Sequence, residues 1–181
     1  MEEMKLFAGR PADEHGREER EIRVYDLLDG LGIAYERVDH APADNMEACL
    51  AVDQVLFPAV ICKNLFLCNT QQTKFYLLMI REDKKFLTKL ISKQIGSARL
   101  SFAPAKYMEK FLDILPGAVS VMGLMNDHEK QVRLLVDEDV IAAEYVGCHP
   151  CVNTSSLRLK TADVFGPFLE RVGHDYTVVR L

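Results

Sequence analysis

Two apolar runs separated by a short polar turn constrain the fold of this chain more than any other feature. The runs are AVICKNLFLCN at 59–69 and KFYLLMI at 74–80, and the turn between them reads NTQQT. Continuous apolar runs of this length are typical of strands buried on both faces of a sheet. A short polar connection pairs two such strands side by side in opposite directions. The sequence therefore predicts a hairpin of buried strands.

The remaining patterns add helices and strands without a regular βαβ alternation. Helical spacing and helix-start residues predict helices at 13–32, 43–52, 83–96, 103–115, 137–147 and 161–173. We expect Asp44 or Asn45 to cap the second helix, and Pro167 to distort the last one. Strands are expected at 33–40, 131–137, 156–159 and 175–181, and a glycine-punctuated loop and strand at 116–125. These elements predict an α+β domain in which helices pack on a mixed sheet.

The composition is that of a globular protein. The chain has 181 residues, of which 49% are hydrophobic and 27% charged, and no apolar stretch is long enough for a membrane helix. The polar, acidic N-terminus has no secretory pattern. We therefore expect a loose leader at 1–16, a single domain at 17–181, a cytoplasmic location and no membrane partner.

The charge is unevenly distributed along the chain. The net charge is −5, yet residues 74–110 hold nine lysines and arginines against three acidic residues, a net of +6. An acidic protein does not coat nucleic acid indiscriminately. The basic segment fits either local contact with a few phosphates or an ordinary solvated helix face.

Lys63 interrupts the most apolar run of the chain, and Asn64 follows it. A lysine in such a run must extend to solvent, find a partner or face a cavity. Each face of the strand would carry one polar group. An edge strand with Lys63 in solvent and a functional cavity both account for this pattern.

Two later motifs combine glycine or cysteine with single polar residues. In PGAVSVMG, Gly117 and Gly123 bracket an apolar run with one hydroxyl, Ser120. A glycine there can bring backbone N–H groups close to a ligand, or simply form a turn. In GCHPCVN, Cys148 and Cys151 enclose His149, and Asn153 follows.

The cysteines do not favour a metal or redox site. A zinc site needs about four ligands, and the chain has no second Cys-x-x-Cys or histidine cluster. A thioredoxin-type pair needs its first cysteine at a helix start, which the polar and β-branched VNTSS does not favour. With an odd total of five, the cysteines are interpreted as reduced packing residues. Phosphate-binding, dinucleotide-binding and serine-esterase motifs are also absent from the sequence.

Taken in order, CKNLFL, PGAVSVMGLMND and GCHPCVNTSSLRL resemble the YbaK-like prolyl-tRNA editing domains, over roughly residues 17–181. This family includes the insertion domain of bacterial prolyl-tRNA synthetase and free-standing ProX-type deacylases of Ala-tRNA(Pro). The resemblance implies an α+β fold with a mixed, largely antiparallel and partly barrel-like central sheet flanked by helices. It also implies an ester hydrolase that needs no cofactor.

The resemblance assigns roles to individual residues. Lys63 matches the strand lysine needed for activity, Gly117 the glycine of the loop over the scissile ester, and His149 and Asn153 the polar wall of the aminoacyl pocket. We expect these roles together with substrate contacts by Asn64, Ala118, Val119, Ser120 and Met122. Where the family has a Ser/Thr-Pro-Phe continuation after the glycine loop, this chain has Ser120-Val121-Met122, which leaves the preferred amino acid open.

The implied substrate is the acceptor end of tRNA(Pro) charged with a small amino acid, alanine before cysteine. The chain is too short to contain a synthetase as well, so it would act in trans, and prolyl-tRNA synthetase is a candidate partner. Two other functions stay open: a non-catalytic binder of aminoacyl-tRNA or amino acid, and a thiol protein that uses Cys148 and Cys151.

Overall fold

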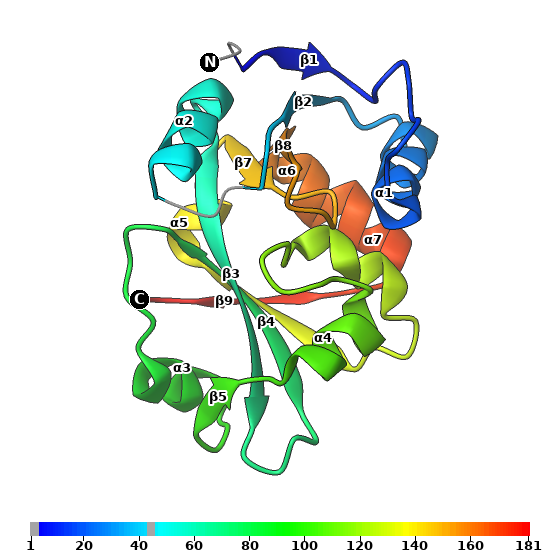
Figure 1. Ribbon diagram of the computed structural model, residues 1–181. Coiled ribbons are helices and arrows are strands. Elements are labelled where there is room, and N and C mark those ends of the chain that lie inside the picture. Colours follow the sequence, from blue (N-terminus) through cyan, green and yellow to red (C-terminus); the bar gives the residue numbers. More distant parts are fainter. Residues whose placement is uncertain (1–3, 43–45) are drawn as a thin grey trace.

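The computed structural model describes residues 4–42 and 46–181 and shows a nine-stranded mixed sheet with helices packed around it (Figure 1). The strand order is β1-β2-β8-β7-β3-β4-β6-β9, and β5 pairs with β3. The strands are β1 (Leu6–Ala8), β2 (Tyr35–Asp39), β3 (Val60–Asn69), β4 (Phe75–Arg81), β5 (Leu100–Phe102), β6 (Val132–Asp137), β7 (Tyr145–Cys148), β8 (Ser155–Lys160) and β9 (Tyr176–Val179).

The predicted hairpin is confirmed and forms the middle of the sheet. β3 and β4 pair antiparallel from Cys62 opposite Arg81 to Cys68 opposite Phe75. Five described strand pairs are antiparallel and three are parallel, namely β3–β7, β4–β6 and β6–β9. The order ends at β1 and at β9, so this sheet is open. The predicted α+β class with a mixed, largely antiparallel sheet is confirmed.

The alternation of side chains along the hairpin explains why both runs are continuously apolar. Successive side chains of a strand point to opposite faces of the sheet. Phe66, Cys68, Phe75, Leu77 and Met79 join the larger core, whereas their neighbours Leu67, Tyr76, Leu78 and Ile80 join a second core on the other face. Burial on both faces fixes the register of the hairpin, because a one-residue slip would exchange the two sets.

The helices are α1 (Glu19–Gly30), α2 (Met46–Leu56), α3 (Thr88–Ile95), α4 (Ala105–Leu112), α5 (Glu138–Ile141), α6 (Thr161–Asp163) and α7 (Leu169–Val172), with a 3₁₀ helix η1 (Val121–Asn126) and a π helix η2 (Val164–Phe168). Figure 1 shows α2 beside the upper end of β3, and α3 and α4 near its lower end. No helix in the described part of the chain is long and apolar enough to cross a bilayer.

Several sequence-based expectations need correction. The segment at 116–125 contains η1 instead of a strand, because the Ser120 hydroxyl accepts the Met122 N–H and starts a helical turn. The helix expected at 137–147 ends at Ile141, and the strand β7 follows it. The expected leader contains β1, which pairs with β2; the division at residue 16 otherwise stays a prediction.

The last helix is distorted as expected, since the π turn η2 contains Pro167. The expected cap at Asp44 or Asn45 lies outside the described residues.

Candidate active site

A cavity of about 640 Å³ lies where α2, the first half of β3, the end of β7 and β8 meet. Five of the nine predicted site residues line it: Lys63, Asn64, Gly117, His149 and Asn153. They come from β3, from the loop after α4 and from the loop after β7. The fold therefore brings together positions that are up to 90 residues apart in the chain. Their catalytic and binding roles stay predictions at this point.

The other four expected contacts do not line the cavity. Ala118, Ser120 and Met122 are buried, and the half-buried Val119 packs against the larger core. Ser120 instead supports the site from behind, because its hydroxyl donates a hydrogen bond of 2.5 Å to the carbonyl oxygen of His149. The turn into η1 points this segment into the protein, and thus places Gly117 alone at the cavity.

Lys63 is exposed, and its ammonium is held at the cavity by a neutral partner. Its Nζ donates a 3.0 Å hydrogen bond to the carbonyl oxygen of Lys84. The Lys84 ammonium itself binds Asp137 and Asp139 at 2.8 and 2.7 Å. Within the described ranges no carboxylate lies within salt-bridge distance of Lys63, so its charge remains available to an anionic ligand.

Asn64 carries an unsatisfied polar atom beside the cavity. Its Oδ1 is buried without a hydrogen-bond partner among the described residues, and its Nδ2 reaches the Cys62 carbonyl only at 3.5 Å. A buried acceptor without a partner costs about 1–3 kcal/mol. A donor group on a bound ligand would remove that cost.

Gly117 has a backbone conformation that favours glycine. Its φ is +92°, and a Cβ atom at this position would lie 3.7 Å from Nδ2 of Asn153. Gly147, also at the cavity, lies close to the side chain of Ile61. A Cβ there would lie 2.5 Å from Cδ1 of Ile61, so a side chain at this position would displace that terminal methyl, which also lines the cavity.

The ring of His149 is oriented by two acceptors. Its Nδ1 lies 3.0 Å from the carbonyl oxygen of Ser155 and 3.3 Å from the hydroxyl of Ser156. A carbonyl can only accept, so Nδ1 carries the proton and Nε2 carries the lone pair. Burial is the largest cause that lowers the pKa of His149; the hydrogen bond to the Ser155 carbonyl opposes it, and the nearby His40 adds to the lowering. Because the pKa lies below its ordinary value, the neutral ring predominates at pH 7.

Sequence reasoning missed four residues of the cavity that bear on its chemistry: His40, Ser156, Asp53 and Glu82. Burial, together with the charge and a hydrogen bond of Glu82, raises the pKa of Asp53 to about 6. The sequence around these residues does not show that they meet, because they come together only through the pairing of β2 with β8 and the packing of α2. The one available signal was the alternating pattern of the strand that ends at His40.

The thiols of the cavity are poor nucleophiles. Cys62 and Cys148 line it, and neither forms a disulfide. Burial raises the pKa of Cys148 to about 12 and also raises the pKa values of Cys62 and Cys151. The reactive form of cysteine is the thiolate. These protonated thiols therefore do not favour a thiol-based function.

The α+β fold places the Lys63 ammonium, the Gly117 backbone and the neutral His149 ring around one cavity. Such a site is suited to ester hydrolysis that uses no nucleophilic side chain. Residues 40–165 match the aminoacyl-tRNA editing domain family. The chain belongs to this family and is an aminoacyl-tRNA deacylase.

Two relatives and one solved structure show how far the similarity extends. The chain is 32% identical over 141 residues to the prolyl-tRNA editing protein ProX of Acetoanaerobium sticklandii, covering 78% of this chain and 85% of that protein. It is 26% identical to the prolyl-tRNA synthetase associated domain-containing protein 1 of Danio rerio, covering 82% and 80%. The fold matches a crystal structure described as a candidate trans-editing enzyme for prolyl tRNA synthetase, with a TM-score of 0.66, 15% identity and coverage of 91% and 98%.

Proposed function

We propose that this protein is a trans-editing hydrolase that removes alanine from mischarged tRNA(Pro). The observation that carries the proposal is the shared cavity of Lys63, Gly117, His149 and Asn153 in a chain similar to a prolyl-tRNA editing protein. Prolyl-tRNA synthetase is the partner whose errors such an enzyme corrects.

The proposed mechanism uses water, backbone dipoles and one positive charge. Attack of water on the aminoacyl ester produces a tetrahedral oxyanion. The backbone N–H groups of the Gly117 loop stabilise it, at about 3 kcal/mol per donor. Lys63 binds a phosphate or ribose hydroxyl of the terminal adenosine. Nε2 of His149 accepts a hydrogen bond from water or from the substrate amine, and a ribose hydroxyl of the tRNA assists the proton transfer.

Selection between amino acids depends on size exclusion. A synthetase site built for proline discriminates poorly against a smaller side chain, since a missing methylene is worth about 1–3 kcal/mol. A second site that admits only small acyl groups corrects this weakness. Because Ala118, Val119 and Met122 lie outside the cavity lining, we assign the size limit to the neighbouring lining residues Gly147 and Ile61.

The basic segment at 74–110 is proposed as the contact for the acceptor stem. It starts at the β3–β4 turn, passes the cavity where the carbonyl of Lys84 holds Lys63, and continues through α3 to α4 (Figure 1). Lys84 is neutralised by Asp137 and Asp139. Lys106 and Lys110 on α4 lie against the rings of Tyr107 and Phe111. Phosphate contacts by such lysines would add affinity without sequence information.

A deacylation panel with tRNA(Pro) charged with alanine, cysteine, serine or proline tests the proposal. We expect release of alanine and no release of proline. Lys63→Ala is expected to lower kcat/KM by about 10²–10³-fold, the range for losing one group that stabilises the transition state. Lys5→Ala, at another exposed lysine outside the cavity, is the matched control and should keep full activity.

Three results would contradict this assignment. Preferred release of cysteine would reassign the substrate. Tight binding of Ala-tRNA(Pro) without release would indicate a non-catalytic binder. Full activity of Lys63→Ala combined with inactivity of Cys148→Ser would assign the chemistry to the thiol.

A further inference from the structure

The cavity contains a second histidine, His40, which is linked to His149 through one serine. His40 follows β2, and its backbone N–H donates to the carbonyl of Thr154 at 3.0 Å, which extends the β2–β8 pairing by one residue. Ser156 lies on β8 opposite Val38 and is buried. The ring centroids of His40 and His149 are 6.4 Å apart. The register of β2 against β8 therefore places the two imidazole rings on opposite sides of the Ser156 hydroxyl.

The hydrogen bonds of this group have only one consistent direction when both rings are neutral. Nδ1 of His40 lies 2.8 Å from the carbonyl of Ala41 and must carry a proton. Its Nε2, 2.9 Å from Ser156 Oγ, therefore accepts the hydroxyl proton. The Ser156 oxygen is then free to accept from Nδ1–H of His149 at 3.3 Å. The chain runs from His149 to Ser156 to His40.

We propose that His40 is a positioning residue for the deacylation: as the last acceptor of this chain it orients Ser156, so that His149 is held with Nε2 available to the cavity. The proposal rests on the proposed function, because it gives His40 a part in that reaction. Both nitrogens of His40 are already engaged, so the residue acts through Ser156 and not on the substrate.

The lone pair on Nε2 of His40 fixes the direction in which the Ser156 hydroxyl proton points. Without that acceptor the Ser156 oxygen can still accept from Nδ1–H of His149, but its own proton is no longer held away from that N–H. Burial is the largest cause of the lowered pKa of His149, the hydrogen bond to the Ser155 carbonyl opposes it, and the electrostatic effect of His40 adds to the lowering. The other titratable groups that line the cavity include Asp53, Glu82, Asp83, Lys63, Cys62 and Cys148. His40 thus combines a geometric with an electrostatic effect on His149.

Nitrogen-15 NMR of the histidine rings in the wild-type protein tests the hydrogen-bond chain without any substrate. At pH 7.5 we expect His40 and His149 as neutral Nδ1–H tautomers. An Nε2–H tautomer at either ring would overturn the proposal. This measurement stands even if the protein releases no amino acid from any tRNA, so it separates failure of this inference from failure of the proposed function.

Single-turnover deacylation with four variants tests the effect on the reaction. His40→Ala and Ser156→Ala should each lower kcat about tenfold with KM unchanged, less than the ~10²–10⁴-fold that a group transferring a proton contributes. His40→Gln keeps an acceptor for Ser156 and should stay within about threefold of wild type, a small geometric cost. The double variant should lose no more than either single variant, since both break one chain. His128→Gln, at an exposed histidine outside the cavity, is the control.

The pH profile separates positioning from a merely structural role. Activity needs neutral His149 and is lost as pH falls through its pKa. Removing His40 removes an electrostatic effect that helps to lower this pKa, so the acid limb of kcat/KM should move to higher pH in His40→Ala and His40→Gln. Wild-type kcat in His40→Ala, or a loss explained entirely by a lower folded fraction, would overturn the proposal.

Discussion

Gly117 is the residue whose backbone the proposed chemistry uses most directly. With φ at +92°, it occupies a region that other residues adopt only with strain, at a cost of about 1–2 kcal/mol. The nearest atom to an added Cβ is Nδ2 of Asn153, at ordinary contact distance. Strain in the backbone, more than crowding, therefore explains why glycine stands here.

Gly117→Ala should therefore reorient the loop and lower kcat for alanine release by about 10²-fold, as expected when a backbone donor is misplaced. The free energy of unfolding, measured in urea, should fall by about 1 kcal/mol. Gly30→Ala is the matched control, because Gly30 has open space around it and no positive φ. An alanine at 117 that leaves kcat unchanged would exclude the loop as the oxyanion donor.

Single residues also show where sequence reasoning reached its limit. Lys63 and His149 could be selected because each stands out from its local pattern. His40 and Ser156 could not, since a histidine at a strand end and a serine in a polar run are ordinary. Their relation depends on which residue of β8 faces which residue of β2, and a single sequence does not encode that register visibly.

At the level of elements, α2 forms one wall of the cavity and is linked by a carboxyl pair to the residue that follows β4. Asp53 on α2 shares a hydrogen bond with Glu82, which follows β4, and both line the cavity. The pKa of Asp53 is raised to about 6, so the folded protein binds more protons here than the unfolded chain between about pH 4 and 6. The resulting stabilisation of the folded state is present at low pH and is lost as pH rises through 6.

Hydrogen-exchange protection factors of α2 should consequently be higher at pH 5 than at pH 7.5, whereas those of α4 serve as the internal reference. In Asp53→Asn the difference for α2 should vanish, because the amide does not titrate. Protection that rises with pH in the wild-type protein would show that the carboxyl pair does not hold α2.

Short strands account for most elements that the sequence did not predict. The hairpin, β6 and the helices α1, α3 and α4 carry strong apolar periodicity and were predicted. β1, β5 and β7 have three or four residues each, too few for a periodic pattern. They exist because the sheet offers them pairing partners, β2 for β1 and β3 for β5 and β7. Tertiary context, not local preference, decides such segments.

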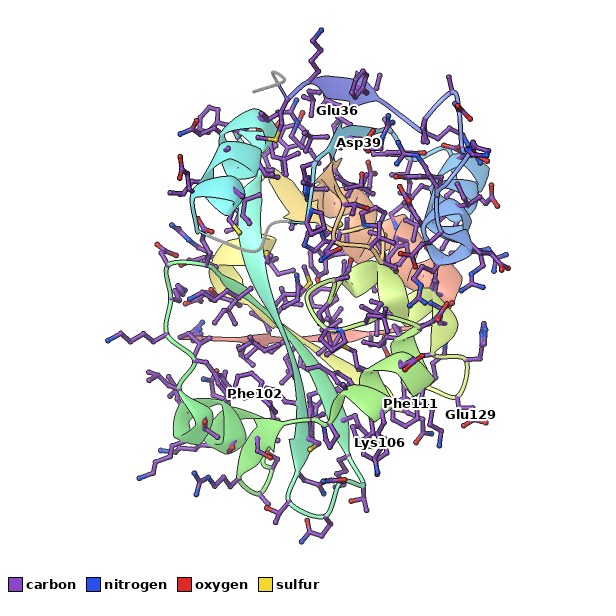
Figure 2. All side chains as sticks on the ribbon, viewed as in Figure 1. Glu36, Asp39, Phe102, Lys106, Phe111 and Glu129 are labelled. Carbon is purple, nitrogen blue, oxygen red and sulfur yellow. The ribbon has the colours of Figure 1, made fainter. Side chains whose placement is uncertain are left out.

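At the scale of the whole molecule, the two ends differ in whether their charged side chains are paired with opposite charges. Lys106 on α4 and Phe102 on β5 lie at the end opposite Glu36 and Asp39 on β2 (Figure 2). Asp39 is bound there by Arg17 and Arg37, which lower its pKa to about 2 despite its burial. The carboxylates at the β2 end are thus paired with arginines, whereas Lys106 and Lys110 have no carboxylate within salt-bridge distance among the described residues, and the proposed tRNA contact lies with these lysines.

The KM for Ala-tRNA(Pro) should increase steeply with salt, and the slope of log KM against log[salt] should fall by about 0.7–0.9 for each phosphate contact removed. Lys106→Ala and Lys110→Ala test this, with Lys5→Ala as control. Unchanged slopes in both α4 variants would place the tRNA contact elsewhere.

One strand, β3, carries Lys63 at the cavity and, a few residues later, Phe66 and Leu67 in the two opposite cores. A genetic screen that scores only lost editing would thus recover substitutions at 66 and 67 as readily as at 63. Measuring how much protein accumulates in the cell would distinguish the two groups. Only the variants at Lys63 should accumulate normally and still lack editing activity.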